Sequence, residues 1–240
     1  MEKEEFKKSL IEKANKIDVE LNDRQLEEFY LYMNLLLEWN EKINLTAITK
    51  PEEIILKHFI DSLTICKYIK QEKSLIDVGT GAGFPGIPLK IVNKDIKITL
   101  LDSLNKRINF LDEVIEKLNL KNIETKHGRA EEFGKDKNYR ENYDIATSRA
   151  VANLSTLSEY LIPLVKIGGR VISMKGQEVK EEISNAKNAI KTLGGKIENI
   201  DEFYLPDSDI KRNIIIIKKV EKTPGRFPRK PGTPAKEPIK

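Results

Sequence analysis

The sequence predicts an α/β fold: an open, mostly parallel sheet with helices on both faces. Three observations lead to this prediction. From residue 74 onward, strand patterns alternate with helical patterns. A turn with four glycines follows the first strand, in the stretch LIDVGTGAGFPGIPLKI (75–91). Two strand patterns, 196–204 and 212–220, end the fold with only the segment PDSDIK between them, which predicts an antiparallel hairpin.

The alternating region contains five predicted strands before the hairpin, at 74–78, 96–101, 122–126, 143–148 and 170–174. Helical patterns separate them, and the clearest has apolar residues at spacings of three and four from Leu104 to Leu118. The predicted sheet therefore has seven strands, within an α/β domain that spans 71–220.

Residues 1–70 predict a helical extension before this domain. Apolar positions recur at helical spacing in 6–17 and 26–37. A third helix is predicted at Thr49-Lys50-Pro51-Glu52, which has the spacing of a capping box with proline near the first turn. The polar linker NEKINLTAITK connects the second and third helices.

Composition excludes several classes of protein. In 240 residues, 33% are charged and 39% hydrophobic, as in a soluble globular protein. The N-terminus is charged throughout, unlike a secretory signal, and no run approaches the roughly 20 apolar residues of a membrane span. Cys66 is the only cysteine, and the two histidines lack metal-ligand spacing. We expect a cytoplasmic monomer that binds neither metal nor membrane.

The C-terminal residues 221–240 form a basic, proline-rich tail. Residues 218–240 hold eight Lys/Arg against two Glu, a charge of +6, and half of the ten prolines. Proline predicts an extended path that is neither helix nor central strand. The tail could be a solubilising or disordered segment. Alternatively, Phe227 between Arg226 and Arg229 could stack on bases beside phosphate contacts.

The glycine loop could hold NAD or S-adenosylmethionine. Asp102, 21 residues after Gly81, ends the second strand and could accept hydrogen bonds from a ribose in either cofactor. Pro85 and Pro88 remove backbone donors that a pyrophosphate needs. Asp77 suits a cationic sulfonium and ammonium but repels a pyrophosphate. The loop therefore favours S-adenosylmethionine, although Asp77 could instead only accept hydrogen bonds from loop N–H groups.

The glycine stretch and five further motifs together resemble the RsmG (GidB) family over nearly the whole chain; these motifs are WNEKINLTAI, KHFIDSL, GRAEEF, SRAV and FPRKPGTPAKEPI. Members of that family are bacterial methyltransferases of 16S ribosomal RNA that act on a guanine N7, at guanine 527. The resemblance implies a Rossmann-like class I fold that uses S-adenosylmethionine. It also implies 16S rRNA or the small ribosomal subunit as partner.

The resemblance implies roles for matching positions. The cofactor would be bound by Gly79, Gly81, Phe84, Asp102, Ser103, Leu104, Ala130, Glu131 and Arg149. The RNA would be bound by Asn44, Thr46, Arg129, Lys175, Arg212, Arg229 and Lys230.

Structural alternatives exist for several of these residues. Arg149 could form a salt bridge to a helix end, and Arg129 could be a solvated loop charge. Asn44 and Thr46 could cap backbone groups. For His58 and Asp61, one turn apart, we expect a structural hydrogen bond rather than a catalytic pair.

Guanine N7 has a free lone pair and no proton, so the reaction needs no general base and we assign no catalytic residue. Two other functions remain open from the sequence. An NAD-dependent oxidoreductase would need a substrate domain and an acid–base residue in the cleft. A non-catalytic RNA-binding or ribosome-assembly factor would use the scaffold without the reaction.

Overall fold

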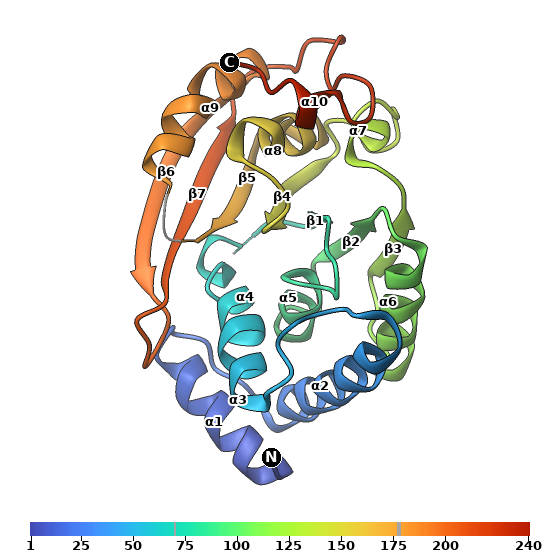
Figure 1. Cartoon of the computed structure of the whole chain (residues 1–240), viewed down its shortest axis with the longest axis vertical. Helices are drawn as coiled ribbons and strands as arrows, with labels where there is room; N and C mark the ends of the chain where they lie inside the picture. Colours follow the sequence, from blue (N-terminus) through green and yellow to red (C-terminus); the bar gives the residue numbers. More distant parts are fainter. Residues whose placement is uncertain (70, 177–178) are drawn as a thin grey trace.

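The fold is a seven-stranded sheet with helices on both faces (Figure 1). The computed structural model describes residues 1–69, 71–176 and 179–240. The sheet order is β3-β2-β1-β4-β5-β7-β6. The strands are β1 (Ser74–Val78), β2 (Lys97–Asp102), β3 (Ile123–His127), β4 (Tyr143–Arg149), β5 (Val165–Lys175), β6 (Gly195–Tyr204) and β7 (Lys211–Lys219). The predicted parallel sheet with a C-terminal hairpin is confirmed, although β5 begins five residues earlier than predicted.

Strand pairing fixes where a ligand can bind. The first five strands pair in parallel, and β7 runs antiparallel to both β5 and β6. Strand β1 lies between β2 and β4, so the chain winds outward from β1 in both directions. Ligands of such sheets bind at this reversal, beyond the carboxyl ends of the strands. Here those ends are Val78, Asp102 and Arg149.

Two hydrophobic clusters cover the two faces of the sheet. One face carries α1 (Lys3–Asn15), α2 (Asp23–Ile43), α3 (Pro51–Ile54), a π-helical turn (Ile55–Ile60), α4 (Asp61–Leu63), a 3₁₀ turn (Cys66–Tyr68), α5 (Gly86–Val92) and α6 (Asn105–Lys117). The other carries α7 (Ala130–Phe133), α8 (Leu154–Leu161), a 3₁₀ turn (Ile162–Leu164), α9 (Lys180–Thr192) and α10 (Thr233–Lys236). The predicted domain boundary at residue 70 lies outside the described residues.

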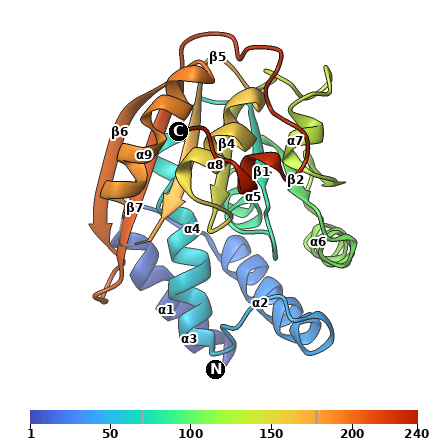
Figure 2. The same cartoon turned by 45° about the horizontal axis from the view of Figure 1, so that its top comes forward.

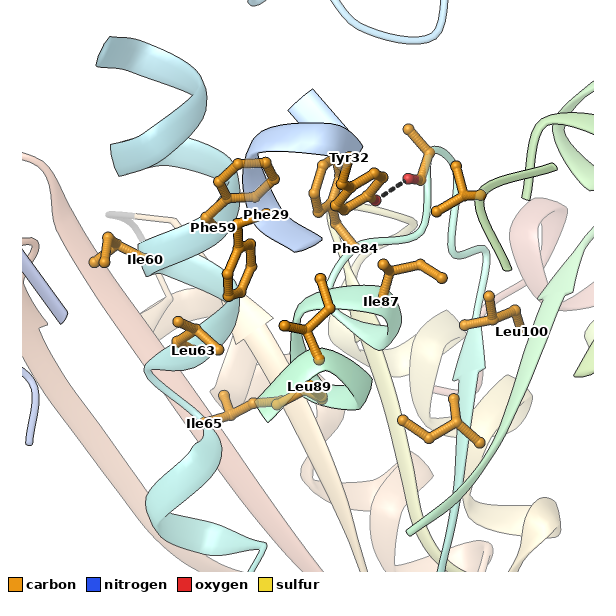
Figure 3. Close-up of a cluster of buried hydrophobic side chains, with 14 of the residues drawn as sticks. Phe29, Tyr32, Phe59, Ile60, Leu63, Ile65, Phe84, Ile87, Leu89 and Leu100 are labelled. Carbon is orange, nitrogen blue, oxygen red and sulfur yellow. Dashed lines mark hydrogen bonds between the residues drawn. The ribbon is translucent and has the colours of Figure 1, made fainter. Parts of the chain in front are cut away.

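The N-terminal helices pack against the glycine loop. Figure 3 shows Phe29, Tyr32 and Phe59 beside Phe84 and Ile87, which come from the glycine loop and α5. The rings of Tyr32 and Phe84 lie 5.4 Å apart, and the Tyr32 hydroxyl donates a hydrogen bond to the Ala82 carbonyl. The loop therefore rests on a packed aromatic surface rather than on solvent.

The predicted capping box before α3 is wrong. The N-cap is Lys50, which makes no side-chain cap hydrogen bond, and Pro51 occupies the first helical position. Proline fits there because the first N–H groups of a helix have no partner within the helix. Thr49 therefore lies one residue too early to cap the helix.

The C-terminal segment, residues 220–240, folds back onto the domain. Phe227 is only 7% exposed and belongs to the cluster that covers α7, α8 and α9. The prediction that this ring is free to stack on RNA is therefore wrong, because burial of the apolar ring against the domain outweighs its basic sequence context. The prediction that this proline-rich segment contains no helix is also wrong, because α10 forms there. Pro234 lies in the first turn of α10, where a backbone N–H would have no partner within the helix.

Candidate active site

A cleft of about 160 Å³ lies at the carboxyl ends of β1 and β2. Its lining is Val78, Gly79, Leu101, Asp102, Ser103, Gly128, Arg129, Ala130, Glu131, Val151 and Tyr160. The structure thus brings together five of the predicted cofactor residues and Arg129. Gly81, Phe84, Leu104 and Arg149 are not in this lining. Sequence reasoning did not assign Val151, although it lies in the quoted motif SRAV, and it gave no signal for Tyr160.

The glycine loop takes a backbone shape that favours glycine. Gly79 and Gly81 have φ of +68° and +62°, in the left-handed region that side chains disfavour. A Cβ on Gly79 would also lie 2.6 Å from Val151 Cγ2. The Gly79 N–H donates to the Leu101 carbonyl at 2.8 Å, so the turn is fastened to the end of β2. The loop therefore presents bare backbone to the cleft.

Asp102 accepts hydrogen bonds from the glycine loop and from the loop that follows β2. Its carboxylate is buried and accepts hydrogen bonds from the Gly81 and Leu104 N–H groups, each at 2.9 Å. Arg107 NH1 pairs with Oδ2 at 3.2 Å. The same NH1 also lies 3.5 Å from Oδ1, so about four lone-pair positions of the carboxylate meet four donor contacts within the chain. Its predicted role toward a ribose stays a prediction.

Asp77 lies fully buried beneath the glycine loop. Its Oδ2 accepts hydrogen bonds from Thr80 Oγ1 at 2.6 Å and from the Gly86 N–H at 2.9 Å. The hydrogen bond to a loop N–H group, given as the alternative role of Asp77, is therefore present. The preference of the Asp77 charge for a cationic ligand stays a prediction. Burial raises the pKa of Asp77 to about 6, although the two hydrogen bonds act to lower it. In the described part of the chain, Oδ1 has no hydrogen-bond partner.

Arg149 ends β4 and reaches across to the N-terminal helices. NH1 donates to the Lys57 carbonyl at 3.0 Å and to Asp61 Oδ2 at 3.2 Å. NH2 lies 3.2 Å from His58 Nδ1, and the guanidinium carbon lies 4.9 Å from the centre of the Phe84 ring. The alternative of a salt bridge to a helical segment is therefore confirmed. Cofactor contact by Arg149 stays a prediction.

His58 connects Arg149 to the linker that follows α2. Because Arg149 donates to Nδ1, the ring carries its proton on Nε2, which lies 2.9 Å from Thr46 Oγ1. Burial and the Arg149 charge lower the pKa of His58 to about 3, so the ring is neutral. It stacks on Phe84 with ring centres 4.5 Å apart. The predicted hydrogen bond between His58 and Asp61 is wrong: both bind Arg149 instead.

Three of the cations predicted to bind RNA are engaged within the chain. Arg212 Nε donates to Asp61 Oδ1 at 3.0 Å. Lys175 binds the Ala152 carbonyl and Glu182. Arg229 forms several hydrogen bonds with the buried Glu159.

The remaining predicted RNA-binding residues are more accessible. Asn44, Arg129 and Lys230 are exposed. Thr46 is half-buried, and its N–H donates to Asn40 Oδ1 at 2.8 Å. Asn44 is the C-cap of α2, with φ of +49° and a backbone N–H that donates to the Asn40 carbonyl. The capping alternative is confirmed for Thr46, whose Oγ1 accepts a hydrogen bond from the Ile48 N–H at 3.0 Å.

Within residues 1–69, 71–176 and 179–240, no group of three His, Cys, Asp or Glu side chains could hold a metal ion. No helix in that same part of the chain is long and apolar enough to cross a membrane.

Two relatives match nearly the whole length of this chain. Ribosomal RNA small subunit methyltransferase G of Acetivibrio thermocellus is 58% identical over 242 residues, which cover 100% of both chains. The protein of the same name from Clostridium botulinum (strain Loch Maree) is 55% identical over 238 residues, covering 98% of this chain and 100% of that one.

Solved structures agree at the level of the fold. A SAM-dependent methyltransferase from Aquifex aeolicus superposes with a TM-score of 0.53 at 18% identity, covering 72% of this chain and 96% of that one. TYW2 of M. jannaschii in complex with AdoMet gives 0.53 at 14% identity, covering 68% and 76%. The family model described as rRNA small subunit methyltransferase G matches residues 25–214. The chain therefore belongs to the rRNA small subunit methyltransferase G family and has the fold of S-adenosylmethionine-dependent methyltransferases.

Proposed function

We propose that this chain transfers a methyl group from S-adenosylmethionine to N7 of a guanine in 16S rRNA, at guanine 527. The observation that supports this most is the glycine loop of a chain of this family. Its Gly81 N–H is hydrogen-bonded to Asp102 beside the cleft, where the strand order of the sheet reverses.

The residues beneath and after the glycine loop fit S-adenosylmethionine better than NAD. Asp77 places a buried carboxylate under the loop, and Oδ1 has no partner among the described residues. That negative charge favours a cationic ligand and opposes a pyrophosphate. Pro85 and Pro88 lack backbone donors at the start of α5. When bound, S-adenosylmethionine supplies a methyl group on a positively charged sulfur that is open to direct displacement.

We assign the binding of the cofactor to the two sides of the cleft. Gly79 allows close approach of the backbone, and Asp102 with Ser103 lies at the end of β2 where a ribose would be bound. Gly81, which lies outside the lining, stays a prediction for the cofactor. Ala130 and Glu131 form the opposite wall. Phe84, Leu104 and Arg149 stay predictions for the cofactor, since their side chains lie outside the cleft lining.

The reaction that we propose requires orientation rather than proton transfer. Guanine N7 attacks with its own lone pair, so the enzyme has to align the base with the methyl group and exclude water. His58, buried beside the glycine loop, is unsuited to act as a base because both ring nitrogens already have partners and its pKa is about 3. This is consistent with a site that contains no catalytic acid–base pair.

We further propose that RNA approaches over the exposed rim of the cleft. Arg129 is exposed in the cleft lining, and Lys230 and Asn44 are exposed elsewhere on the protein. Contacts of this kind position the RNA backbone without reading its sequence. Arg212 and Lys175 could join only if they exchanged their present ion pairs for phosphate groups.

The test uses purified protein, labelled S-adenosylmethionine, and either naked 16S rRNA or small ribosomal subunits. The RNA is then cleaved by chemistry selective for N7-methylguanine. We expect label at one guanine, greatly reduced transfer by Asp102→Asn, and unchanged transfer by Asp209→Asn, whose exposed carboxylate lies in the hairpin turn. Tight cofactor binding without transfer to either form of RNA would refute the proposed acceptor.

A further inference from the structure

The C-terminal segment lies along the wall of the cleft formed by α7 and α8. Figure 2 shows it (dark red) passing α7 and returning beside α8 and α9. Arg140, from the loop after α7, donates to the carbonyls of Thr223 and Phe227, each at 2.7 Å. The Lys240 carbonyl accepts a hydrogen bond from Asn188 of α9. The segment is therefore fastened to the domain along its length.

Close packing joins the middle of the segment to α7. Phe227 shares its hydrophobic cluster with Ala130, the first residue of α7. Pro228 packs on Gly134, at the end of α7, so closely that a Cβ there would lie 2.8 Å from Pro228 Cγ. Both ends of this short helix therefore depend on the position of the segment.

Two buried carboxylates receive their hydrogen bonds from this segment. Glu131 of α7 is 3% exposed and accepts from the Gly232 N–H at 2.8 Å. Glu159 of α8 is fully buried and accepts from the Arg229 N–H at 2.7 Å and from Arg229 NH2 at 2.7 Å. Arg229 Nε also lies 3.0 and 3.1 Å from the two oxygens. A buried carboxylate without partners is costly, so removing the segment disfavours this arrangement of α7 and α8.

One of these carboxylates lines the cleft, and the other precedes a residue that lines it. Glu131 and its neighbour Ala130 line it, and so does Tyr160, which follows Glu159 in α8. Gly232 has φ of +84°, which a glycine adopts without strain, and this turn presents its N–H to Glu131.

We propose that the C-terminal segment is a positioning element of the cofactor site, in which Arg229 and Gly232 hold α7 and α8 at the spacing that the cofactor requires. This inference rests on the proposed function, because it takes S-adenosylmethionine as the ligand of the cleft. Arg229 acts through Glu159 and is a positioning residue rather than a contact of the RNA.

The experiment measures the affinity of the full-length protein for S-adenosylhomocysteine by calorimetry and its affinity for 16S rRNA by filter binding. Arg229→Ala is compared with Arg229→Lys and with Arg226→Ala, a control three residues earlier whose exposed arginine lies over the Phe227 ring, 5.1 Å from its centre. Hydrogen exchange of residues 130–133 and the melting temperature are followed in the same proteins. Glu159→Gln, which keeps the shape of the side chain, is a second variant in case Arg229→Ala does not fold.

We expect Arg229→Ala to weaken S-adenosylhomocysteine binding at least tenfold and to speed exchange in α7, with RNA affinity unchanged. Arg229→Lys should restore part of the affinity, Glu159→Gln should weaken it severalfold, and Arg226→Ala should bind like the wild type. A loss confined to RNA affinity would overturn the inference in favour of a phosphate contact. A lower melting temperature with unchanged cofactor affinity would overturn it in favour of a purely structural role. If the wild type itself did not bind S-adenosylhomocysteine, the proposed function would fail instead.

Discussion

Replacing Asp61 with alanine tests how the N-terminal helices are joined to the sheet. Asp61 is buried and accepts hydrogen bonds from Arg149 of β4 and Arg212 of β7, at 3.2 and 3.0 Å. These arginines follow it by 88 and 151 residues. The carboxylate therefore connects three distant parts of the chain.

The expected cost follows from the surroundings of each arginine. The Arg149 side chain is 15% exposed and would keep the Lys57 carbonyl, His58 and the Phe84 ring. None of these is an anion, so the loss of the Asp61 counter-charge should cost about 3 kcal/mol, the lower end of the range for breaking a buried pair. Arg212 is 23% exposed and can turn toward water, which adds at most about 1 kcal/mol. Asp61→Ala should therefore lower the unfolding free energy by about 3 to 4 kcal/mol.

Urea denaturation followed by circular dichroism measures this change, and the melting temperature should fall by roughly 10 °C. Asp207→Ala is the control, because its ion pairs with Lys13 and Lys16 are exposed to solvent and its midpoint should stay close to that of the wild type. A loss below about 1 kcal/mol in Asp61→Ala would refute the reasoning, since it would mean that Arg149 finds equivalent partners.

Three further predictions concern the glycine loop and its support. Gly79→Ala forces a side chain into φ of +68° and against Val151, so cofactor affinity measured by calorimetry should fall more than tenfold; an unchanged affinity would contradict the assigned cradle. The folded-state pKa of His58, about 3, lies below its ordinary 6.5, so the unfolded chain binds the proton first and the wild type loses stability as pH falls below 6.5. The stability advantage of the wild type over His58→Asn should therefore shrink by about 2 kcal/mol between pH 7 and pH 5 in urea titrations, and a constant difference would contradict a neutral ring. The folded-state pKa of Asp77, about 6, lies above its ordinary 3.8, so the stability that this group contributes is full below pH 3.8 and is lost as pH rises through 6. Asp77→Asn should accordingly be about 1 to 2 kcal/mol more stable than the wild type at pH 8 and bind the cofactor more weakly; lower stability at pH 8 would show that the ionised carboxylate is well solvated.

The cleft could be predicted from the sequence because its main parts are local. The first strand, the glycines and α5 follow one another directly, and Asp102 ends the next strand. Parallel pairing of Val78 with Leu101 then places the glycine loop beside Asp102. Patterns of this kind need no knowledge of distant contacts, so the sheet and the loop were predicted correctly.

The roles of the charged residues could not be predicted in this way. Whether Arg149 faces the cleft or the N-terminal helices depends on Asp61 and His58, which are close to it only in the folded protein. Phe227 follows a basic arginine in the sequence, yet its burial depends on packing with α7 and α8. The local sequence does not show these contacts, because the partners of the charged residues are 70 or more residues away in the chain.

The strand order β5-β7-β6 also has a consequence for the newly made chain on the ribosome. Strand β7 inserts between β5 and β6, so neither can complete its pairing until residues 211–219 have been synthesised. Until then β5, which contains the apolar residues Val171, Ile172 and Met174, exposes an unpaired edge of the parallel sheet. Unpaired edges of this kind favour aggregation. A chain that stops before β7 should therefore accumulate as an aggregate, whereas one that reaches residue 219 can close its sheet.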